Sequence, residues 1–320
     1  MRHTKITLAL MGVATLMCAA ISAAWPGPGI PTPATTTTRT ATATSTSTPA
    51  LLPTPTATLT SAPTLIPSLT PAQSQDLNAL PTPDAGAEAR MARLPVLMYH
   101  YVEPWPADAD EARKNLTVRP EDFAAQMQYL AENGYATVSL YDLLDALSLG
   151  RTLPEKAVVL TFDDGYRGLM EYALPVMQRY GFAGTVFVIT EFSDRELPAY
   201  LTWPQVRQLF GLGWRIEPIT KTHTPLAGQP RDKQLYEMLG SIETIQANLG
   251  VRPRFFAYPM GKYDELTLQL AREMHLWGGV TTGGGRLHAY TERFTWTRMR
   301  VDGRGTLKDF INAVEGDLRR

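Results

Sequence analysis

The sequence predicts an α/β domain, a barrel or a sandwich on a parallel sheet, in residues 89–320. Apolar runs of strand length alternate there with segments whose apolar residues repeat every 3.6 residues, as expected for strands joined by crossover helices. At roughly 230 residues the region is long enough for one large core. Its 27 basic and 28 acidic residues nearly cancel, which argues against a nucleic-acid backbone as the main partner.

About seven strands are expected in this region. They cover residues 95–99, 157–162, 185–190, 214–220, 254–259, 278–282 and 294–301. Helical stripes lie between them at 123–130, 169–180 and 235–249, and Pro175 should kink the second of these helices. In such architectures the loops that follow the strands form the functional face, so polar residues placed there are candidate site residues.

Residues 1–24 are typical of a secretory signal peptide. Basic Arg2 and Lys5 precede an apolar run over 6–20, and small residues follow at 22–24. An uncleaved anchor is the alternative, because the run is close to the shortest length that spans a bilayer. Both readings place the domain outside the cytoplasm, secreted or at the cell surface, and only the anchor brings a membrane into contact with the chain.

Residues 25–88 have the composition of a disordered linker. They contain 12 of the 25 prolines, are rich in threonine, and include few charged residues. So little apolar surface cannot offset the entropy of an ordered chain, so we expect an extended tether rather than a domain.

Two adjacent carboxylates follow a strongly apolar strand at Asp163 and Asp164, and Gly165 comes next. Taken alone, Asp-Asp-Gly is more often a solvated turn. Two acids abutting a buried strand repel each other, however, and a bound cation would relieve that repulsion. His100, His223 and a third histidine, His288, also follow predicted strands; for the first and third a plain loop or strand-end role stays open.

Several segments resemble, in order and spacing, the polysaccharide deacetylase (NodB-homology) family, and in particular its exported bacterial branch that includes poly-N-acetylglucosamine deacetylases. They are Leu-Pro-Val-Leu-Met-Tyr-His at 94–100, Val-Val-Leu-Thr-Phe-Asp-Asp-Gly-Tyr at 158–166, Gly-Thr-Val-Phe-Val at 184–188, Thr-His at 222–223, and Phe-Ala-Tyr-Pro-Met-Gly-Lys-Tyr-Asp at 256–264. The resemblance covers residues 93–305, with its core motifs from about residue 156. It implies a distorted (β/α) barrel of about seven strands and a hydrolase that removes acetyl groups from the amides of an N-acetylhexosamine polysaccharide.

By that resemblance Asp163 is the general base, and Asp164 and His223 hold a divalent metal of the zinc, manganese or cobalt type. The family's second motif begins with another histidine, and Ile219 stands at that position. Isoleucine cannot bind a metal, and two protein ligands are fewer than the three typical of catalytic zinc. Three outcomes follow: Glu217, His100 or His288 completes the site, the metal binds weakly, or the domain is a carbohydrate-binding descendant without hydrolysis.

The general acid is the second open position, because the histidine that family members often carry near the C-terminus is absent after His288. His100 is the first candidate and His288 the second. Arg298 matches an arginine of this branch and would orient Asp163, and a surface ion pair is the alternative reading of Arg298.

Three further residues are expected along the sugar groove. Tyr258 and Pro259 would line its wall, with the Tyr258 backbone N–H as an oxyanion donor by analogy. Trp105 would stack on a sugar ring or, alternatively, anchor its loop. The polymer itself is left open among peptidoglycan, poly-N-acetylglucosamine, chitin and acetylxylan, the last through hydrolysis of an O-acetyl ester.

Overall fold

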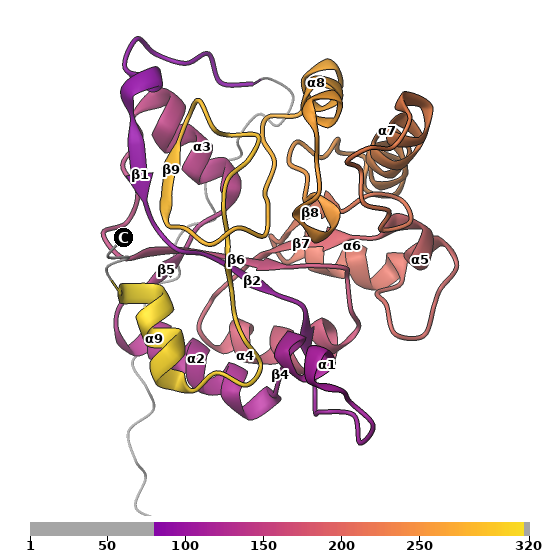
Figure 1. The fold of residues 1–320 in the computed structure, drawn as a ribbon. Coiled ribbons are helices and arrows are strands. Elements are labelled where there is room, and N and C mark those ends of the chain that lie inside the picture. Colours follow the sequence, from indigo (N-terminus) through magenta and orange to yellow (C-terminus); the bar gives the residue numbers. More distant parts are fainter. Residues whose placement is uncertain (1–79, 317–320) are drawn as a thin grey trace, which may run out of the picture. The chain divides into compact units, whose positions relative to one another are not determined.

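The computed structural model describes residues 80–316 as an α/β domain around a parallel sheet (Figure 1). The sheet has six strands in the order β10-β2-β6-β7-β8, with β5 added beside β6. Their bounds are β2 Val96–Tyr99, β5 Ala136–Thr137, β6 Ala157–Phe162, β7 Thr185–Val188, β8 Arg215–Pro218 and β10 Met299–Arg300. Every pairing is parallel, as the alternating strand and helix pattern predicts.

Hydrogen bonds carry the sheet around from β8 back to β10 and close the distorted barrel. The Ala257 N–H donates to the carbonyl of Pro218 at 3.1 Å, at the end of β8. Parallel bridges then join Ala257 to Val280 and Val280 to Trp296, and the chain reaches β10, which pairs with β2. The three predicted strands in this arc are therefore present only as single bridges and one strand of two residues. Glycines interrupt them: a Cβ on Gly279 would lie 2.5 Å from the Tyr258 hydroxyl.

Two short ladders were not predicted. Strand β1 (Met91–Arg93) pairs antiparallel with β9 (Leu287–Ala289), and β3 (Tyr101–Val102) pairs parallel with β4 (Thr117–Val118). Strands of two or three residues are too short to show an alternating pattern, so their pairing depends on contacts that only the fold brings together.

The predicted linker ends before residue 88. A 3-10 turn forms at Ala87–Ala89, Asp84 pairs with Arg90 at 2.9 Å, and the Asp84 N–H donates to the carbonyl of Ser148. These contacts attach the segment to the domain. The predicted signal peptide and residues 25–79 lie outside the described residues. Within residues 80–316, no helix is both long and apolar enough to cross a membrane.

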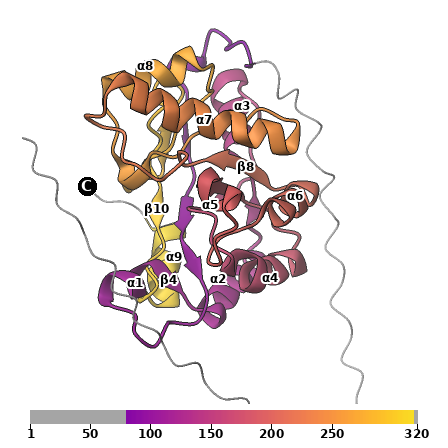
Figure 2. The same ribbon diagram turned by 90° about the vertical axis from the view of Figure 1, so that its right-hand side faces the viewer.

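The helices surround the sheet (Figure 2). In chain order they are α1 Glu111–Leu116, α2 Pro120–Glu132, α3 Leu140–Leu149, α4 Leu174–Arg179, α5 Thr190–Asp194, α6 Trp203–Gly211, α7 Arg231–Leu249, α8 Glu265–Glu273 and α9 Leu307–Glu315. A π-helical turn at Leu169–Ala173 precedes α4, and Pro175 lies in the first turn of α4. The helical run predicted for 169–180 is therefore a π-helical turn followed by α4, and the backbone at their junction, Ala173 and Leu174, is helical.

Alternation along β6 sets which side chains enter the barrel. Val158, Leu160 and Phe162 join a core cluster that includes residues of the helices α2, α4, α6 and α9. Ala157 and Val159 join a second cluster, which contains residues from all around the ring of strands and from α3. Because the side-chain period of a strand is two, the residues that continue the inner series are Thr161 and Asp163.

A buried carboxyl group links β8 to the weakly paired arc of the barrel. Glu217 is 1% exposed; it accepts a hydrogen bond from the Tyr141 hydroxyl at 2.7 Å and from the N–H groups of Arg254 and Phe255 at 3.0 and 2.9 Å. Burial raises the pKa of Glu217 from 4.5 to about 7. The carboxyl group is therefore protonated more readily in the folded chain than in the unfolded chain.

This pKa predicts a pH-dependent free energy of unfolding. The stability contributed by protonated Glu217 should be fully present below about pH 4.5 and lost as the pH rises through about 7, an effect of about 3 kcal/mol. Glu217→Gln should remove this dependence, because an amide does not titrate. Urea unfolding of the parent and the variant at pH 5 and pH 8 checks it. Equal changes in both proteins would contradict the prediction.

Candidate active site

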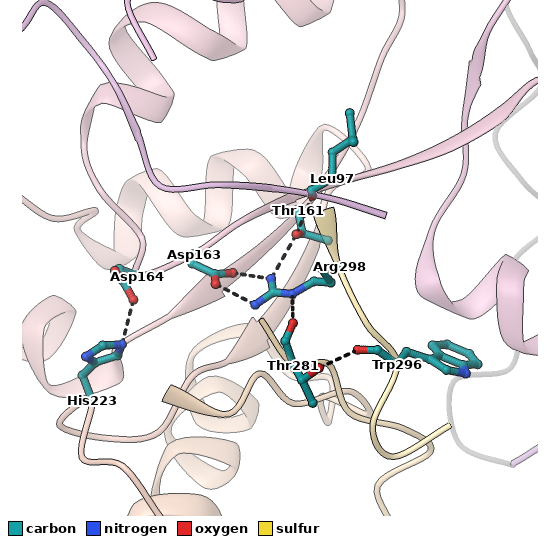
Figure 3. A network of polar contacts seen from close by, with 8 residues as sticks. All are labelled: Leu97, Thr161, Asp163, Asp164, His223, Thr281, Trp296 and Arg298. Atoms are coloured by element: carbon teal, nitrogen blue, oxygen red, sulfur yellow. Dashed lines mark hydrogen bonds and ion pairs between the residues drawn. The ribbon is translucent and has the colours of Figure 1, made fainter. Parts of the chain in front are cut away.

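The acid pair lies where β6 ends. Asp163 continues the inner series of the strand, and its N–H donates to the carbonyl of Tyr99 at 2.9 Å. Asp164 then takes a left-handed conformation with φ 68°, which an aspartate adopts more readily than most residues, and Gly165 follows with φ 72°. This turn sends the two neighbouring carboxylates to different partners (Figure 3).

Asp163 faces Arg298, which lies just before β10. The guanidinium Nη1 and Nη2 donate to the two carboxylate oxygens at 2.6 and 2.7 Å. Arg298 is 0% exposed, and its other donors reach the Thr161 hydroxyl and the Thr281 carbonyl, each at 3.0 Å. A bidentate pair in this setting fixes the plane of the carboxylate. Arg298 is thus an inner residue of the barrel and not part of a surface ion pair.

Asp164 faces His223, in the loop after β8. The carboxylate Oδ1 lies 3.2 Å from the imidazole Nε2, an ion-pair distance, and Oδ1 has no hydrogen-bond partner. Burial raises the pKa of Asp164, but the combined effect of His223 and His100 is larger and opposite, so the pKa lies below its ordinary value. Burial lowers the pKa of His223, and Asp164 and Asp163 raise it above its ordinary value.

The position of the missing histidine belongs to the apolar interior. Ile219 is 2% exposed, belongs to the same core cluster as Phe187 and Ile189, and donates its N–H to the Val188 carbonyl. A residue in these surroundings offers no ligand. Of the two motif positions after β8, only His223 therefore faces the acid pair.

Two of the three residues considered as replacement ligands lie elsewhere. Glu217 is occupied by Tyr141 and two backbone N–H groups. His288 is buried on β9; its Nε2 lies 3.2 Å from the Leu94 carbonyl, its ring faces Trp296, and burial lowers its pKa to about 4. The expectation that His288 serves this site does not fit these contacts.

His100 is the remaining histidine near the acid pair. It is half-buried at the end of β2. Burial lowers its pKa below the ordinary value, while the charges of Asp163 and Asp164 act in the opposite direction. His100, like His223, interacts electrostatically with both carboxylates.

Asp164 and His223 together fit one edge of a metal site. Two ligand atoms bound to one tetrahedral zinc at 2.0–2.1 Å lie about 3.3 Å apart, close to the separation of Oδ1 and Nε2, and Oδ1 is a buried acceptor without a donor. No group of three histidine, cysteine, aspartate or glutamate residues suited to a metal occurs within residues 80–316. The pair thus offers two protein ligands, one fewer than is typical of catalytic zinc.

The expected groove residues differ in their exposure. The Tyr258 side chain is 0% exposed, and its N–H donates to the Val280 carbonyl at 3.2 Å, so neither group is free for a sugar or an oxyanion. Pro259 is buried, whereas the adjacent Met260 is 65% exposed. The Trp105 indole N–H donates to the Thr117 carbonyl at 2.9 Å, which fits a loop anchor.

Two features beside the acid pair were missed from the sequence. Tyr166 stacks on Tyr101, with ring centroids 3.6 Å apart, and lies 5.1 Å from the ring of Tyr200, and all three tyrosines interact electrostatically with Asp164. The carboxylate of Glu237 on α7 contacts the loop that carries His223. Tyr166 could have been identified from the sequence, because it directly follows Asp-Asp-Gly. Glu237 could not, because it is one acidic residue within a long helix.

The family model of polysaccharide deacetylases matches residues 150–277. The Bacillus subtilis strain 168 protein YxkH, named for the polysaccharide deacetylases, is 31% identical over 210 residues, covering 66% of this chain and 72% of YxkH. A poly-beta-1,6-N-acetyl-D-glucosamine N-deacetylase of Escherichia coli K12 is 33% identical over 128 residues, covering 35% of this chain and 18% of that enzyme.

Solved structures agree with these relatives. The Streptococcus pyogenes deacetylase PplD in complex with acetate superposes with a TM-score of 0.66 at 28% identity and covers 71% of this chain and 100% of PplD. IcaB from Ammonifex degensii, at 23% identity and a TM-score of 0.58 over 66% of this chain and 92% of IcaB, shares the fold. This chain therefore belongs to the polysaccharide deacetylase family, hydrolases that act on amide bonds.

Proposed function

We propose that this chain is an exported, metal-dependent deacetylase that hydrolyses the N-acetyl groups of an N-acetylhexosamine polysaccharide outside the cell or at its surface. The observation that carries the proposal is the buried bidentate pair of Asp163 and Arg298 directly beside Asp164 and His223. A carboxylate held in one orientation next to a pair that fits a metal edge is what water-mediated amide hydrolysis requires.

Asp163 acts as the general base in this proposal. Each of its oxygens accepts one hydrogen bond from Arg298, and each retains a second lone pair. That lone pair takes a proton from the attacking water, and Arg298 stabilises the carboxylate without competing for the proton, because a guanidinium stays charged. A divalent cation held by Asp164 and His223 would polarise the acetyl carbonyl.

The leaving amine needs a proton when the C–N bond breaks. His100 supplies it in this proposal, because it interacts with both carboxylates and, unlike His223, is not assigned to the metal. Acetate and a free amine on the sugar are then the products. Trp105, 36% exposed, remains a proposed contact of the polysaccharide, whereas buried Pro259 does not.

The proposed substrate and location rest on several features. The domain is nearly neutral, which disfavours a nucleic acid, and an E. coli relative is named for poly-beta-1,6-N-acetyl-D-glucosamine. The N-terminal 24 residues have the pattern of a signal peptide, and the Thr- and Pro-rich residues after them would tether the domain. Peptidoglycan and chitin carry the same N-acetylhexosamine chemistry.

The nature of the bond can be tested with paired substrates. We expect the full chain, supplied with zinc, cobalt or manganese, to release acetate from N-acetylglucosamine oligomers with one free amine per acetate. Acetylated xylan serves as the O-ester control. Acetate from xylan alone would show an esterase, which tolerates a poorer site because its leaving group is better.

A second candidate function is carbohydrate binding without hydrolysis. The buried Ile219 favours it, because isoleucine replaces a metal ligand of the family motif. In that case the oligomers would bind to the chain, and acetate release would not exceed that of a heat-inactivated sample. This outcome would contradict the proposed deacetylase activity.

A further inference from the structure

A buried glutamate on α7 holds the backbone just before His223. Glu237 is 0% exposed, and its Oε2 accepts hydrogen bonds from the N–H groups of Lys221 and Thr222 at 3.1 and 2.9 Å. Its Oε1 accepts from the Thr222 hydroxyl at 2.6 Å and from the Lys233 ammonium at 2.7 Å. Both oxygens are thus engaged, and three of the four donors belong to two consecutive residues of the His223 loop.

The backbone in this loop needs such support. Thr220 and His223 have φ of 64° and 61°, in the left-handed region, which is unfavourable above all for a β-branched residue such as threonine. They flank Lys221 and Thr222, the two residues that Glu237 binds. Conformations of this kind persist only where the surroundings over-determine them, and they gather at functional sites. The glutamate supplies that determination from a neighbouring helix.

Placing a carboxylate at this buried position is energetically unfavourable by itself. A charged group that is fully buried is unfavourable unless it is paired and hydrogen-bonded. Burial raises the pKa of Glu237, but Lys233 and Thr222 lower it below the ordinary value, so the group stays ionised. Lys233 itself is partly exposed, with 40% of its side chain accessible. The strongest acceptor available is therefore directed at backbone N–H groups of the loop.

We propose that Glu237 is a positioning residue that fixes the loop at residues 220–223 so that the His223 imidazole faces Asp164. The role concerns the orientation of the His223 imidazole. It rests on the proposed function only for the use of that imidazole in binding a metal. Glu237 does not touch substrate or reacting atoms in this account; it acts through Thr222 and the backbone.

The first test observes His223 directly in the full chain without added metal. Selective labelling with ¹⁵N-histidine gives ring signals from five histidines, and His223→Gln identifies the signal of interest. We expect Glu237→Ala to shift the His223 ring signals while those of His275 and His288 stay in place. Glu237→Gln should remain closer to the parent, because its amide oxygen can still accept from both backbone N–H groups.

The second test measures zinc affinity by calorimetry. Loss of a residue that orients a ligand typically weakens metal binding by about 10- to 100-fold, and we expect this for Glu237→Ala. In the His223→Ala background the same change should have no further effect, since Glu237 acts through His223. A general structural role would weaken binding equally in both backgrounds.

Two further variants and the histidine signals keep the inference separable from the proposed function. Lys233→Met removes only the ammonium partner and should leave the His223 signals near those of the parent. Thr222→Val removes one of the three loop donors, so it tests the inference if Glu237→Ala does not fold. If the parent binds no zinc, the metal part of the proposed function fails and the histidine signals still decide. Unshifted His223 signals in folded Glu237→Ala, or in Thr222→Val when Glu237→Ala does not fold, would overturn the inference.

Discussion

Asp163→Asn is expected to reduce acetate release from N-acetylglucosamine oligomers by about 10²- to 10⁴-fold. The amide has the size of the carboxylate and can still accept from Arg298, but it cannot take a proton from water. The loss should fall on kcat, because Asp163 acts on the attacking water and not on the sugar. Steady-state acetate release at saturating oligomer measures it.

A matched control separates lost chemistry from lost stability, because Asp163→Asn leaves the buried charge of Arg298 without an anionic partner. Asp145 is another buried aspartate, paired with Arg151 at 2.6 Å, and it lies outside the site. Asp145→Asn should therefore retain activity. Both variants should be compared below their unfolding midpoints. Parent-like kcat in folded Asp163→Asn would show that Asp163 is not the base.

Ile219→His is expected to tighten zinc binding by at least about 10- to 100-fold. Loss of a residue that only orients a metal ligand weakens binding by that range, so gain of a ligand itself should have at least as large an effect. The change restores the histidine four residues before His223 that the family motif carries, and it raises the protein ligands from two to three. Its cost is an imidazole in the cluster that contains Phe187 and Ile189. Zinc titration of both chains, each first treated with chelator, measures the difference.

Ile189→His is the control for that substitution. Ile189 is as buried as Ile219, at 2% exposure, and belongs to the same apolar cluster. A histidine there should leave zinc affinity unchanged, because residue 189 does not occupy the motif position. Equal tightening by both substitutions would point to adventitious binding. No tightening by Ile219→His would remove position 219 from the account of the site.

Strong apolar runs made the first half of the barrel predictable. Strands β2, β6 and β7 lie within their expected ranges, because parallel strands buried on both faces form continuous apolar segments. Strand β8, Arg-Ile-Glu-Pro, also lies within its expected range, although it is not continuously apolar. The arc at residues 254–301 was harder to predict. Gly279 packs against Tyr258, and its neighbours pair through single bridges, so the expected long strands reduce to isolated pairs. Closure there depends on tertiary hydrogen bonds that no local pattern encodes.

The site was predictable where a residue matches a recognised motif and not where its role depends on packing alone. Asp164 and His223 are brought within 3.2 Å, and Arg298 reaches Asp163 across 135 residues as the matching motif suggested. Exposure was harder to infer: Tyr258 follows a strand, yet its side chain is fully buried. Glu237 was missed, since only the packing of α7 beside the loop gives it a role.

The most direct test of the account is acetate release from N-acetylglucosamine oligomers by the full chain before chelation, after it, and after a divalent metal is restored. Asp164→Ala is assayed beside the parent. The account predicts release that chelation abolishes and metal restores in the parent, with little release from Asp164→Ala under any condition. Release that persists through chelation and in Asp164→Ala would contradict the central claim that the pair of Asp164 and His223 holds a metal used in hydrolysis.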